Sequence, residues 1–339
     1  MTASEGYTRQ IKRRRRALVA MTVATLLFAL LSLFFGRYPK PGFFLPFGWR
    51  SDALMRSILF NVRLPRIALS LLAGSMLSAS GYAFQMLFSN PLVEPGFLGV
   101  SQGSAFGAAL MIVLGAGSTA AVQASATVFG LLALVASYVL ARRFRFGGWL
   151  LRLVLSGIAV SAIFSSALAT VKLVAEPTKD LQDITFWMMG GLWNASWRQL
   201  FSILWIVLLC QAIIISQRWK LNLLSLGEKT SFSVGINPKR DRTILLVVAT
   251  VGTTLVISIT GLIGWVGLIT PHLARKMFGS ESSFSLPASM VIGAFFLLSS
   301  DTIGRTLLPT EIPIGLVTSL FGAAIFIIIL SLKHQGGKA

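Results

Sequence analysis

Acidic residues and cysteines are scarce in this sequence. Asp and Glu number 11 against 30 Lys and Arg, and charged residues make up 12% of the 339, about half the share of roughly 25% in soluble domains. The one cysteine, Cys210, lies in an apolar run, so it cannot form an intrachain disulfide and is expected to be a small buried hydrophobe. This composition excludes an ordinary water-soluble domain.

Residues that carry catalysis are also few. The two histidines, His272 and His334, belong to no group of His, Cys and carboxylates with metal-ligand spacing, and the Gly-x-Ser-x-Gly signature of a nucleophile elbow is absent. Residues 227–230, Gly-Glu-Lys-Thr, lack the Gly-Lys dipeptide and the upstream glycine of a phosphate-binding loop. We predict no catalytic residue, no metal and no cofactor in this chain, and hence no enzyme.

Long apolar runs account for most of the chain. Hydrophobic residues make up 55% and the mean hydropathy is +0.77, while about 20 apolar residues suffice for one helical crossing of a membrane. Helices are favoured because lipid leaves no partner for open backbone groups, and barrel strands would be shorter and alternating. The sequence predicts an all-α polytopic membrane protein with ten transmembrane helices at residues 17–35, 62–87, 96–115, 120–141, 150–173, 195–217, 241–260, 262–279, 285–305 and 312–332.

Basic residues predict the orientation of these helices. The tail 1–16 is strongly basic, and we expect the first helix to be retained rather than removed as a signal peptide. Ten crossings put both termini on one side, where 20 of the 30 Lys and Arg residues then fall, as cytoplasmic segments require. We therefore predict a single transmembrane domain, 17–332, between the cytoplasmic tails 1–16 and 333–339. The charges lie in short clusters between apolar runs, so we expect no nucleic-acid partner.

Two long stretches lie outside the predicted spans. Residues 36–61 are rich in Pro, Gly and aromatic residues, which predicts an external loop at the membrane interface. Residues 218–242 predict two short cytoplasmic helices, broken at Gly227 and ended by Gly235 and Pro238. The apolar side of these helices needs a partner, which is either the membrane surface or a soluble subunit.

Glycine and proline mark two further features. Gly99, Gly103 and Gly107 recur every four residues, which is typical of close helix packing or of the smooth wall of a cavity. Residues 90–96, Asn-Pro-Leu-Val-Glu-Pro-Gly, cannot be helical throughout. They form either a tight connection between helices or a constriction beside a cavity. The lack of a clear mid-membrane carboxylate argues against an ion-coupled carrier.

Several motifs follow one another along the chain. They are Arg63-Leu64-Pro65-Arg66, Asn90-Pro91-Leu92-Val93-Glu94-Pro95-Gly96-Phe97-Leu98-Gly99, Trp187-Met188-Met189-Gly190-Gly191, Leu221-Asn222-Leu223-Leu224-Ser225-Leu226-Gly227, Gly235-Ile236-Asn237, Gly261-Leu262-Ile263-Gly264-Trp265-Val266-Gly267-Leu268-Ile269-Thr270-Pro271-His272-Leu273-Ala274-Arg275, Asp301-Thr302 and Ile312-Pro313-Ile314-Gly315. In this order and spacing, over about residues 55–332, they resemble the iron-chelate and vitamin B12 permeases of type II ABC importers, the FecCD-like family.

The resemblance implies a homodimer in the bacterial cytoplasmic (inner) membrane, with a translocation path along the dimer axis. Two ATP-binding subunits would attach on the cytoplasmic face, and an external substrate-binding protein would dock outside. ATP and Mg would bind to the ATPase subunits, and membrane lipid would surround the dimer. The short helices of 218–242 would then be coupling helices that contact the ATPase, through Leu221, Leu223, Leu224, Leu226, Gly227, Glu228 and Gly235.

The resemblance also implies roles for other residues. Arg63, Arg66 and Arg305 correspond to arginines that meet glutamates of the binding protein, with lipid phosphates as the alternative contact. Asn90 and Leu92 correspond to a cytoplasmic gate, and the turn 147–151 lies where the family has its other gate. The stripe Gly99, Gly103 and Gly107 would pack beside the pathway, and His272 is expected to be structural.

These expectations combine into one prediction of function. The chain would be the permease subunit of an ATP-driven importer, working by alternating access. Its cargo would be a bulky metal chelate, such as a ferric siderophore, haem or cobalamin, received from a docked binding protein. The alternatives are a secondary transporter driven by an ion gradient and an ABC importer for an oxyanion such as molybdate.

Overall fold

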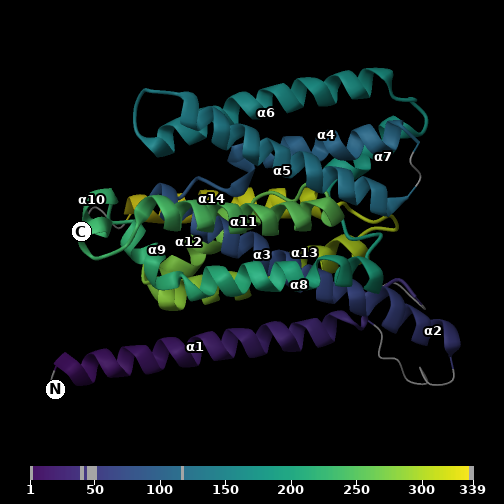
Figure 1. Ribbon diagram of the computed structural model, residues 1–339. Coiled ribbons are helices and arrows are strands. Elements are labelled where there is room, and N and C mark those ends of the chain that lie inside the picture. Colours follow the sequence, from purple (N-terminus) through teal and green to yellow (C-terminus); the bar gives the residue numbers. More distant parts are fainter. Residues whose placement is uncertain (1–2, 39–41, 44–51, 116–117, 336–339) are drawn as a thin grey trace.

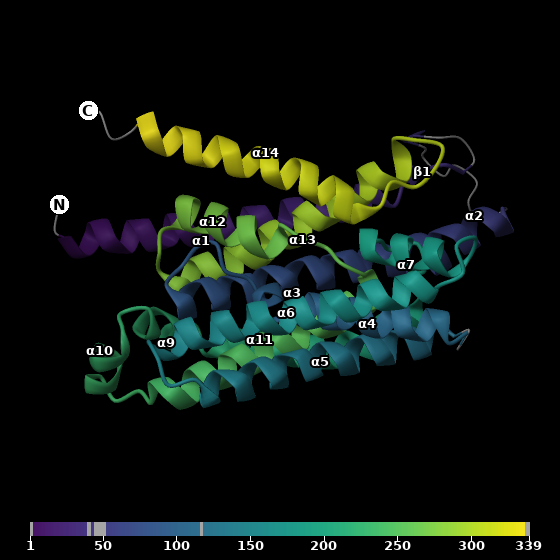
Figure 2. The ribbon, with the colours of Figure 1, turned by 90° about the horizontal axis from the view of Figure 1, so that it is seen from above.

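The computed structural model describes all residues except 1–2, 39–41, 44–51, 116–117 and 336–339. Its long helices run side by side between two ends of the molecule (Figures 1 and 2). One end, called the terminal end below, carries both chain termini and helix α10 (Glu228–Ser233). The opposite end, called the distal end, carries α2 (Ala53–Ser57) and α7 (Asp180–Met189).

One helix corresponds to each of the ten predicted spans. These helices are α1 (Ala3–Ser32), α3 (Leu64–Phe88), α4 (Val100–Val113), α5 (Thr119–Arg143), α6 (Trp149–Val174), α8 (Trp197–Ser216), α11 (Pro238–Thr260), α12 (Val266–Phe278), α13 (Ser282–Thr306) and α14 (Ile314–Gln335). Within the described residues, seven helices are long and apolar enough to cross a membrane. The fold is therefore polytopic and nearly all helical, while the count of ten crossings stays a prediction.

The shorter elements connect these helices. Besides α2, α7 and α10, they are the π-helix η1 (Ile58–Arg63), the 3₁₀ helix η2 (Pro95–Leu98), α9 (Arg218–Leu224) and the strands β1 (Phe35–Gly36) and β2 (Gly42–Phe43). The two strands pair antiparallel, with Phe35 opposite Phe43. The prediction of a purely helical chain therefore missed this small ribbon, which is too short to leave an alternating pattern in the sequence.

The predicted external loop 36–61 is wrong for residues 53–61, which are helical, while its residues 39–41 and 44–51 lie outside the described part of the chain. A continuous helix runs from Ala53 through η1 into α3. Asp52 begins it, because its Oδ1 accepts the backbone N–H groups of Leu54 and Met55 at 2.9 and 3.0 Å. The Met55 N–H, and then the Tyr38 hydroxyl and the Leu54 N–H, lower the pKa of Asp52 against the opposing effect of desolvation.

The predicted breaks near Gly227 and Gly261 are confirmed. Helices α9 and α10 are separated at Gly227, with a φ of +97°, and Gly235 follows α10 with a φ of +85°. Helix α11 ends before Gly261, with a φ of +66°, and α12 begins five residues later. These positive φ angles are readily adopted only by glycine.

Helix α3 is the central helix of the bundle. Within its most apolar stretch 83% of the residues are buried, against 22% for α6 at the periphery. Small residues allow this burial: a β-carbon on Gly74 would lie 2.3 Å from the Gly293 carbonyl oxygen, and one on Gly81 would lie 1.9 Å from that of Gly267. The backbones of α12 and α13 therefore pack directly against α3.

Helix α1 is attached mainly along α13. Only 17% of its most apolar stretch is buried, so most of its apolar surface faces outward. At the distal end, the Ser32 and Thr302 hydroxyls lie 2.8 Å apart, and the Arg305 guanidinium donates to Ser32. Phe28 and Phe295 add an aromatic contact, with ring centroids 5.1 Å apart. Contacts to α13, with smaller ones to α3 and α12, thus hold α1 in place.

Ion pairs link three segments beneath the distal surface. Arg66 of α3 donates to Asp301 of α13 at 2.8 Å and to Glu311, in the α13–α14 connection, at 3.0 Å. Arg305 lies 3.7 Å from the second oxygen of Asp301. Asp301 is fully buried, so its charge depends on these arginines for compensation.

We predict that Asp301→Ala destabilises the protein by about 3–5 kcal/mol, because it leaves the buried charge of Arg305 without an ion pair and that of Arg66 with Glu311 alone. Thermal unfolding of the purified chain in detergent measures the loss. The control is Glu281→Ala, which removes a partly exposed ion pair with Arg14 and should cost less than about 1 kcal/mol. Equal losses of stability in the two variants would show that the buried network stabilises the protein no more than a partly exposed ion pair does.

Candidate functional site

The short helices α9 and α10 form one unit at the terminal end. The Ser231 hydroxyl lies within hydrogen-bond distance of two carbonyl oxygens, at 2.7 Å from that of Leu223 and at 2.6 Å from that of Gly227. The Arg242 guanidinium of α11 donates to the Leu224 carbonyl at 3.2 Å. The Asn222 side chain accepts the Ser282 backbone N–H at 2.9 Å, at the start of α13. A displacement of α9 and α10 would therefore be transmitted to α11 and α13 through these hydrogen bonds.

The residues predicted for ATPase contact divide into two groups. Leu221 and Leu224 are fully buried and belong to the hydrophobic core, while Leu223 packs against that core. Leu226 is exposed, and Gly227 and Gly235 shape the turns around α10. Glu228 begins α10, but its side chain lies outside the part of the structure that is described. The leucines thus anchor the unit more than they cover its outer surface.

Sequence reasoning missed the outer surface of this unit. Phe232 has an exposed fraction of 73%, and Val234 is half exposed. Together with Leu226 they form what we call the apolar tip. Hydropathy gave no signal for Phe232, because it is an isolated aromatic residue between serines. An exposed apolar group of this kind at a polar helix end is typical of a surface that meets a partner.

The three arginines predicted for docking lie at the distal end but inside the protein. Arg63, Arg66 and Arg305 are each 5% exposed. Arg63 donates to the carbonyls of Leu33 and Tyr38 at 2.7 and 3.0 Å, and the other two belong to the Asp301 network. Their predicted contact with a binding protein stays a prediction, and within the chain their side chains are buried and bonded. Their common effect here is to fasten α1, α3 and α13 beneath the distal surface.

The predicted gate residues lie in an exposed turn after α3. Helix α3 ends at Ser89, whose φ of +49° is unusual for a residue other than glycine. Asn90 Oδ1 accepts the Leu92 backbone N–H at 2.9 Å, which is an Asx turn. The Leu92 side chain is half exposed, so it is free to project from the turn. The carboxylate of Glu94 instead faces inward, where a β-carbon on Gly267 would lie 3.5 Å from it.

The glycine stripe of α4 packs against neighbouring helices of the same chain. A β-carbon on Gly103 or Gly107 would lie 2.6 or 2.5 Å from a carbonyl oxygen of α5. Gly99, with a φ of +81°, lies against Val160 of α6. Of the two interpretations that the spacing left open, close helix packing fits these contacts.

Three motif segments, far apart in sequence, meet near the distal end. The Gly191 backbone N–H donates to the Thr260 carbonyl at 2.7 Å, and the Gly315 N–H donates to the Gly190 carbonyl at 3.4 Å. A β-carbon on Gly261 would lie 2.1 Å from the Trp187 carbonyl oxygen. Helix ends from α7, α11 and α14 therefore meet through backbone contacts.

A cavity of about 400 Å³ lies beside the place where the ends of α7, α11 and α14 meet, which we call the three helix breaks. Its lining includes Met188 and Leu262 from the breaks and Lys172 from the last turn of α6. Within the described residues, no group of three or more His, Cys, Asp or Glu side chains could hold a metal ion. His272 lies half-buried within α12 and has a contact within the chain. The cavity is thus lined by apolar and small residues beside one cation.

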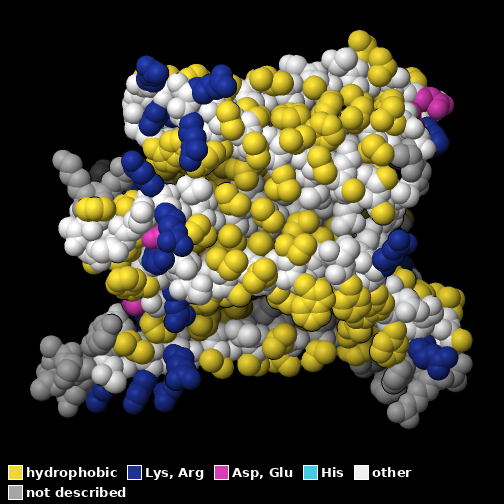
Figure 3. Space-filling view, viewed as in Figure 1, with side chains coloured by type: hydrophobic (Ala, Val, Ile, Leu, Met, Phe, Trp, Pro, Cys, Tyr) yellow, Lys and Arg dark blue, Asp and Glu magenta, His cyan; other side chains and the backbone are white. Residues whose placement is uncertain are grey.

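The two ends differ in charge. Figure 3 shows Lys and Arg side chains gathered at the terminal end, and a broad apolar band over the helices between the ends. This is the distribution expected of a protein whose helices cross a membrane. The apolar band and the seven long apolar helices place the chain in a membrane.

Comparison with known proteins bears on this architecture. The model of the FecCD transport family matches residues 23–332. The molybdate import system permease protein MolB of Haemophilus influenzae is 34% identical over 95% of this chain and 97% of its own length. A probable iron chelatin transport system permease protein of Helicobacter pylori is 38% identical over 80% of this chain and 82% of its own.

A solved structure agrees with the fold. It is assigned to the metal-chelate type of ABC transporter in an inward-facing conformation, is 34% identical and superposes with a TM-score of 0.86. The match covers 94% of this chain and 99% of the solved one. The motif resemblance is thereby confirmed over nearly the whole sequence. The chain therefore belongs to the FecCD transport family, as a multi-pass protein of the inner membrane.

Proposed function

We propose that this chain is the permease subunit of an ATP-driven importer that carries a bulky metal chelate into the cytoplasm. The observation that carries the proposal is the family match over residues 23–332, in a fold that superposes on an ABC transporter with a TM-score of 0.86. The substrate would cross between two copies of the chain. ATP would be bound and hydrolysed by separate subunits.

In this proposal the terminal end faces the cytoplasm. The gathering of Lys and Arg there supports this orientation. The apolar tip of Leu226, Phe232 and Val234 would insert into the ATPase subunit. Movement of the tip would pass to α13 through the Asn222–Ser282 hydrogen bond and to α11 through Arg242. The two copies of the chain would then rock between outward-open and inward-open states.

The distal end would receive the substrate-binding protein. Because Arg63, Arg66 and Arg305 are buried and bonded within the chain, we propose that they hold the docking surface in shape from beneath. The charges that would guide an acidic partner then include the exposed cations Arg56, Lys179 and Arg198 of this end.

A second cargo class is favoured by a specific observation. One relative that aligns over 95% of this chain carries molybdate in its name, alongside a vitamin B12 permease of Klebsiella pneumoniae that aligns over 96% at 36% identity. Lys172 places one cation at the cavity beside the three helix breaks, which suits an anion as well as an acidic chelate. An oxyanion is therefore the second candidate.

We predict that vesicles containing this chain and its ATPase take up cargo only with ATP on the cytoplasmic side and with the binding protein outside. Uptake of radiolabelled ferric siderophore, haem, cobalamin and molybdate should be compared, each after a thermal-shift assay of the binding protein with the same compound. Our proposal requires ATP-dependent uptake of a metal chelate. Uptake of molybdate alone would establish the second candidate, and uptake driven by an ion gradient without ATP would refute both.

We predict that Phe232→Glu weakens ATPase binding by about 2 kcal/mol, or roughly thirtyfold, because it puts a charge on the most exposed residue of the apolar tip. The measurement is the dissociation constant of the purified permease with its ATPase subunit, together with ATP hydrolysis in proteoliposomes. Met277→Glu is the matched control, since Met277 is 62% exposed at the end of α12, outside the apolar tip. Wild-type affinity in the Phe232 variant would contradict the coupling role.

A further inference from the structure

A cleft lined by cations opens at the terminal end. It lies between the end of α5, the beginning of α6 and the beginning of α11, and its volume is about 920 Å³. Five basic residues contribute to its wall, and no Asp or Glu does. They are Arg142, Arg152, Lys239, Arg240 and Arg242.

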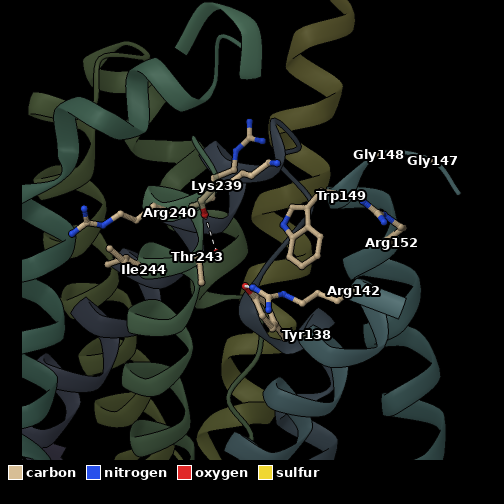
Figure 4. A pocket seen from close by; sticks show the side chains of 11 residues that line it. Tyr138, Arg142, Gly147, Gly148, Trp149, Arg152, Lys239, Arg240, Thr243 and Ile244 are labelled. Atoms are coloured by element: carbon tan, nitrogen blue, oxygen red, sulfur yellow. Dashed lines mark hydrogen bonds between the residues drawn. The ribbon is translucent and has the colours of Figure 1, made fainter. Parts of the chain in front are cut away.

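The close view shows how these side chains are arranged. In Figure 4, Trp149 lies between Lys239 and Thr243 on one side and Arg152 on the other, with Arg142 and Tyr138 below it, while Arg240 points away from the cleft. The Tyr138 and Trp149 rings meet edge to face, with centroids 5.3 Å apart. An aromatic wall therefore holds cations from two distant parts of the sequence around one hollow.

Three of these cations have only neutral partners. Arg142 donates to the Tyr138 hydroxyl at 2.8 Å, and Arg152 donates to the Phe144 carbonyl at 2.6 Å. In the described part of the chain, neither they nor Lys239 form an ion pair. Nearby, by contrast, Lys220 pairs with Asp241 at 2.9 Å. Like charges around a hollow repel one another, so an anion placed among them would be stabilised.

The backbone adds to this positive field. Helix α6 begins at Trp149, directly at the cleft, and its N-cap residue, Gly148, offers no side-chain acceptor to the first N–H groups. The N-terminal end of a helix carries a partial positive charge and favours anions. The dipole of α6 and the three cations therefore act in the same direction.

Orientation in the membrane does not explain this arrangement. The positive-inside tendency requires cations on the cytoplasmic side, and Arg143, Arg145 and Lys276 satisfy it as exposed residues that do not line the cleft. It does not require Arg142, Arg152 and Lys239 to converge on one concave site without acidic partners. Convergence is the feature that points to a ligand.

We propose that this cleft binds a phosphate-type oxyanion, presented either by the headgroup of an anionic phospholipid or as a free ion. Arg142, Arg152 and Lys239 would donate charge-assisted hydrogen bonds to its oxygens. Trp149 and Ile244, which also line the cleft, would accompany the apolar part of a lipid. The proposal does not depend on the importer function, since it concerns only residues of this chain, among them part of the turn 147–151 that the resemblance matches to a gate.

The test uses the full-length chain and its triple variant Arg142→Gln, Arg152→Gln, Lys239→Gln. One arm measures retention of phosphatidylglycerol against phosphatidylcholine by native mass spectrometry, after extraction from nanodiscs that contain both. The other arm measures equilibrium binding of radiolabelled inorganic phosphate to delipidated chain in detergent. Loss of three contacts worth about 1 kcal/mol each should weaken binding roughly a hundredfold.

A matched control removes the same charge elsewhere at this end, as Arg143→Gln, Arg145→Gln, Lys276→Gln. Wild-type binding by the control and loss in the triple variant supports the site. Selective retention of phosphatidylglycerol then identifies a lipid headgroup, and binding of phosphate alone identifies a free ion. Equal losses in both variants, or no anion binding in either arm by the wild-type chain, would overturn the proposal. Thermal unfolding confirms that each variant is folded.

Discussion

A helix that ends within a membrane must find partners for its open backbone groups inside the protein. In this chain the ends of α7 and α11 and the beginning of α14 are joined by backbone hydrogen bonds. The Gly191 N–H donates to the Thr260 carbonyl, and the Gly315 N–H donates to the Gly190 carbonyl. Glycine is needed at these points because the backbones approach too closely for a β-carbon. The irregular segments beside the distal cavity exist only because all three meet. The segment after α7 is bonded to both of the others, so a displacement of it would free backbone groups in each.

The basic side chains have different surroundings at the two ends of the bundle. At the distal end, arginines are buried and compensated by Asp301, Glu311 and backbone carbonyls. At the terminal end, basic side chains gather at the surface, and some line a cleft with neutral neighbours only. The distal cations are thus fixed by acidic and carbonyl partners, while Arg142, Arg152 and Lys239 at the terminal end form no ion pair in the described part of the chain. This division suits a protein that receives cargo on one face and responds to other subunits on the opposite face.

Much of this fold could be predicted from the sequence, because hydropathy alone located a helix for each of ten segments, and glycines located the breaks. The start of the helix leading into α3 was missed, since Asp52 acts through a local cap that hydropathy does not detect. The Arg66–Asp301 pair was also missed, because 235 residues separate its members and neither carries a local signal of the other. Similarly, Leu221 and Leu224 share one apolar pattern with Leu226, and only tertiary packing distinguishes buried anchors from the exposed tip.

The long sequence separation of the distal ion pairs has a consequence for biosynthesis. Arg66 leaves the ribosome 235 residues before Asp301, an interval on the order of 10 to 50 s at roughly 5–20 residues per second. During that time α3 holds an arginine near its beginning without the counter-ion that will neutralise it. Ser32 of α1 likewise meets Thr302 of α13 only after another 270 residues have been made, whereas its neighbour Leu33 is bonded much earlier by Arg63. The distal ion pairs are therefore complete only when the second half of the chain has been made, and the first helices begin with local contacts alone.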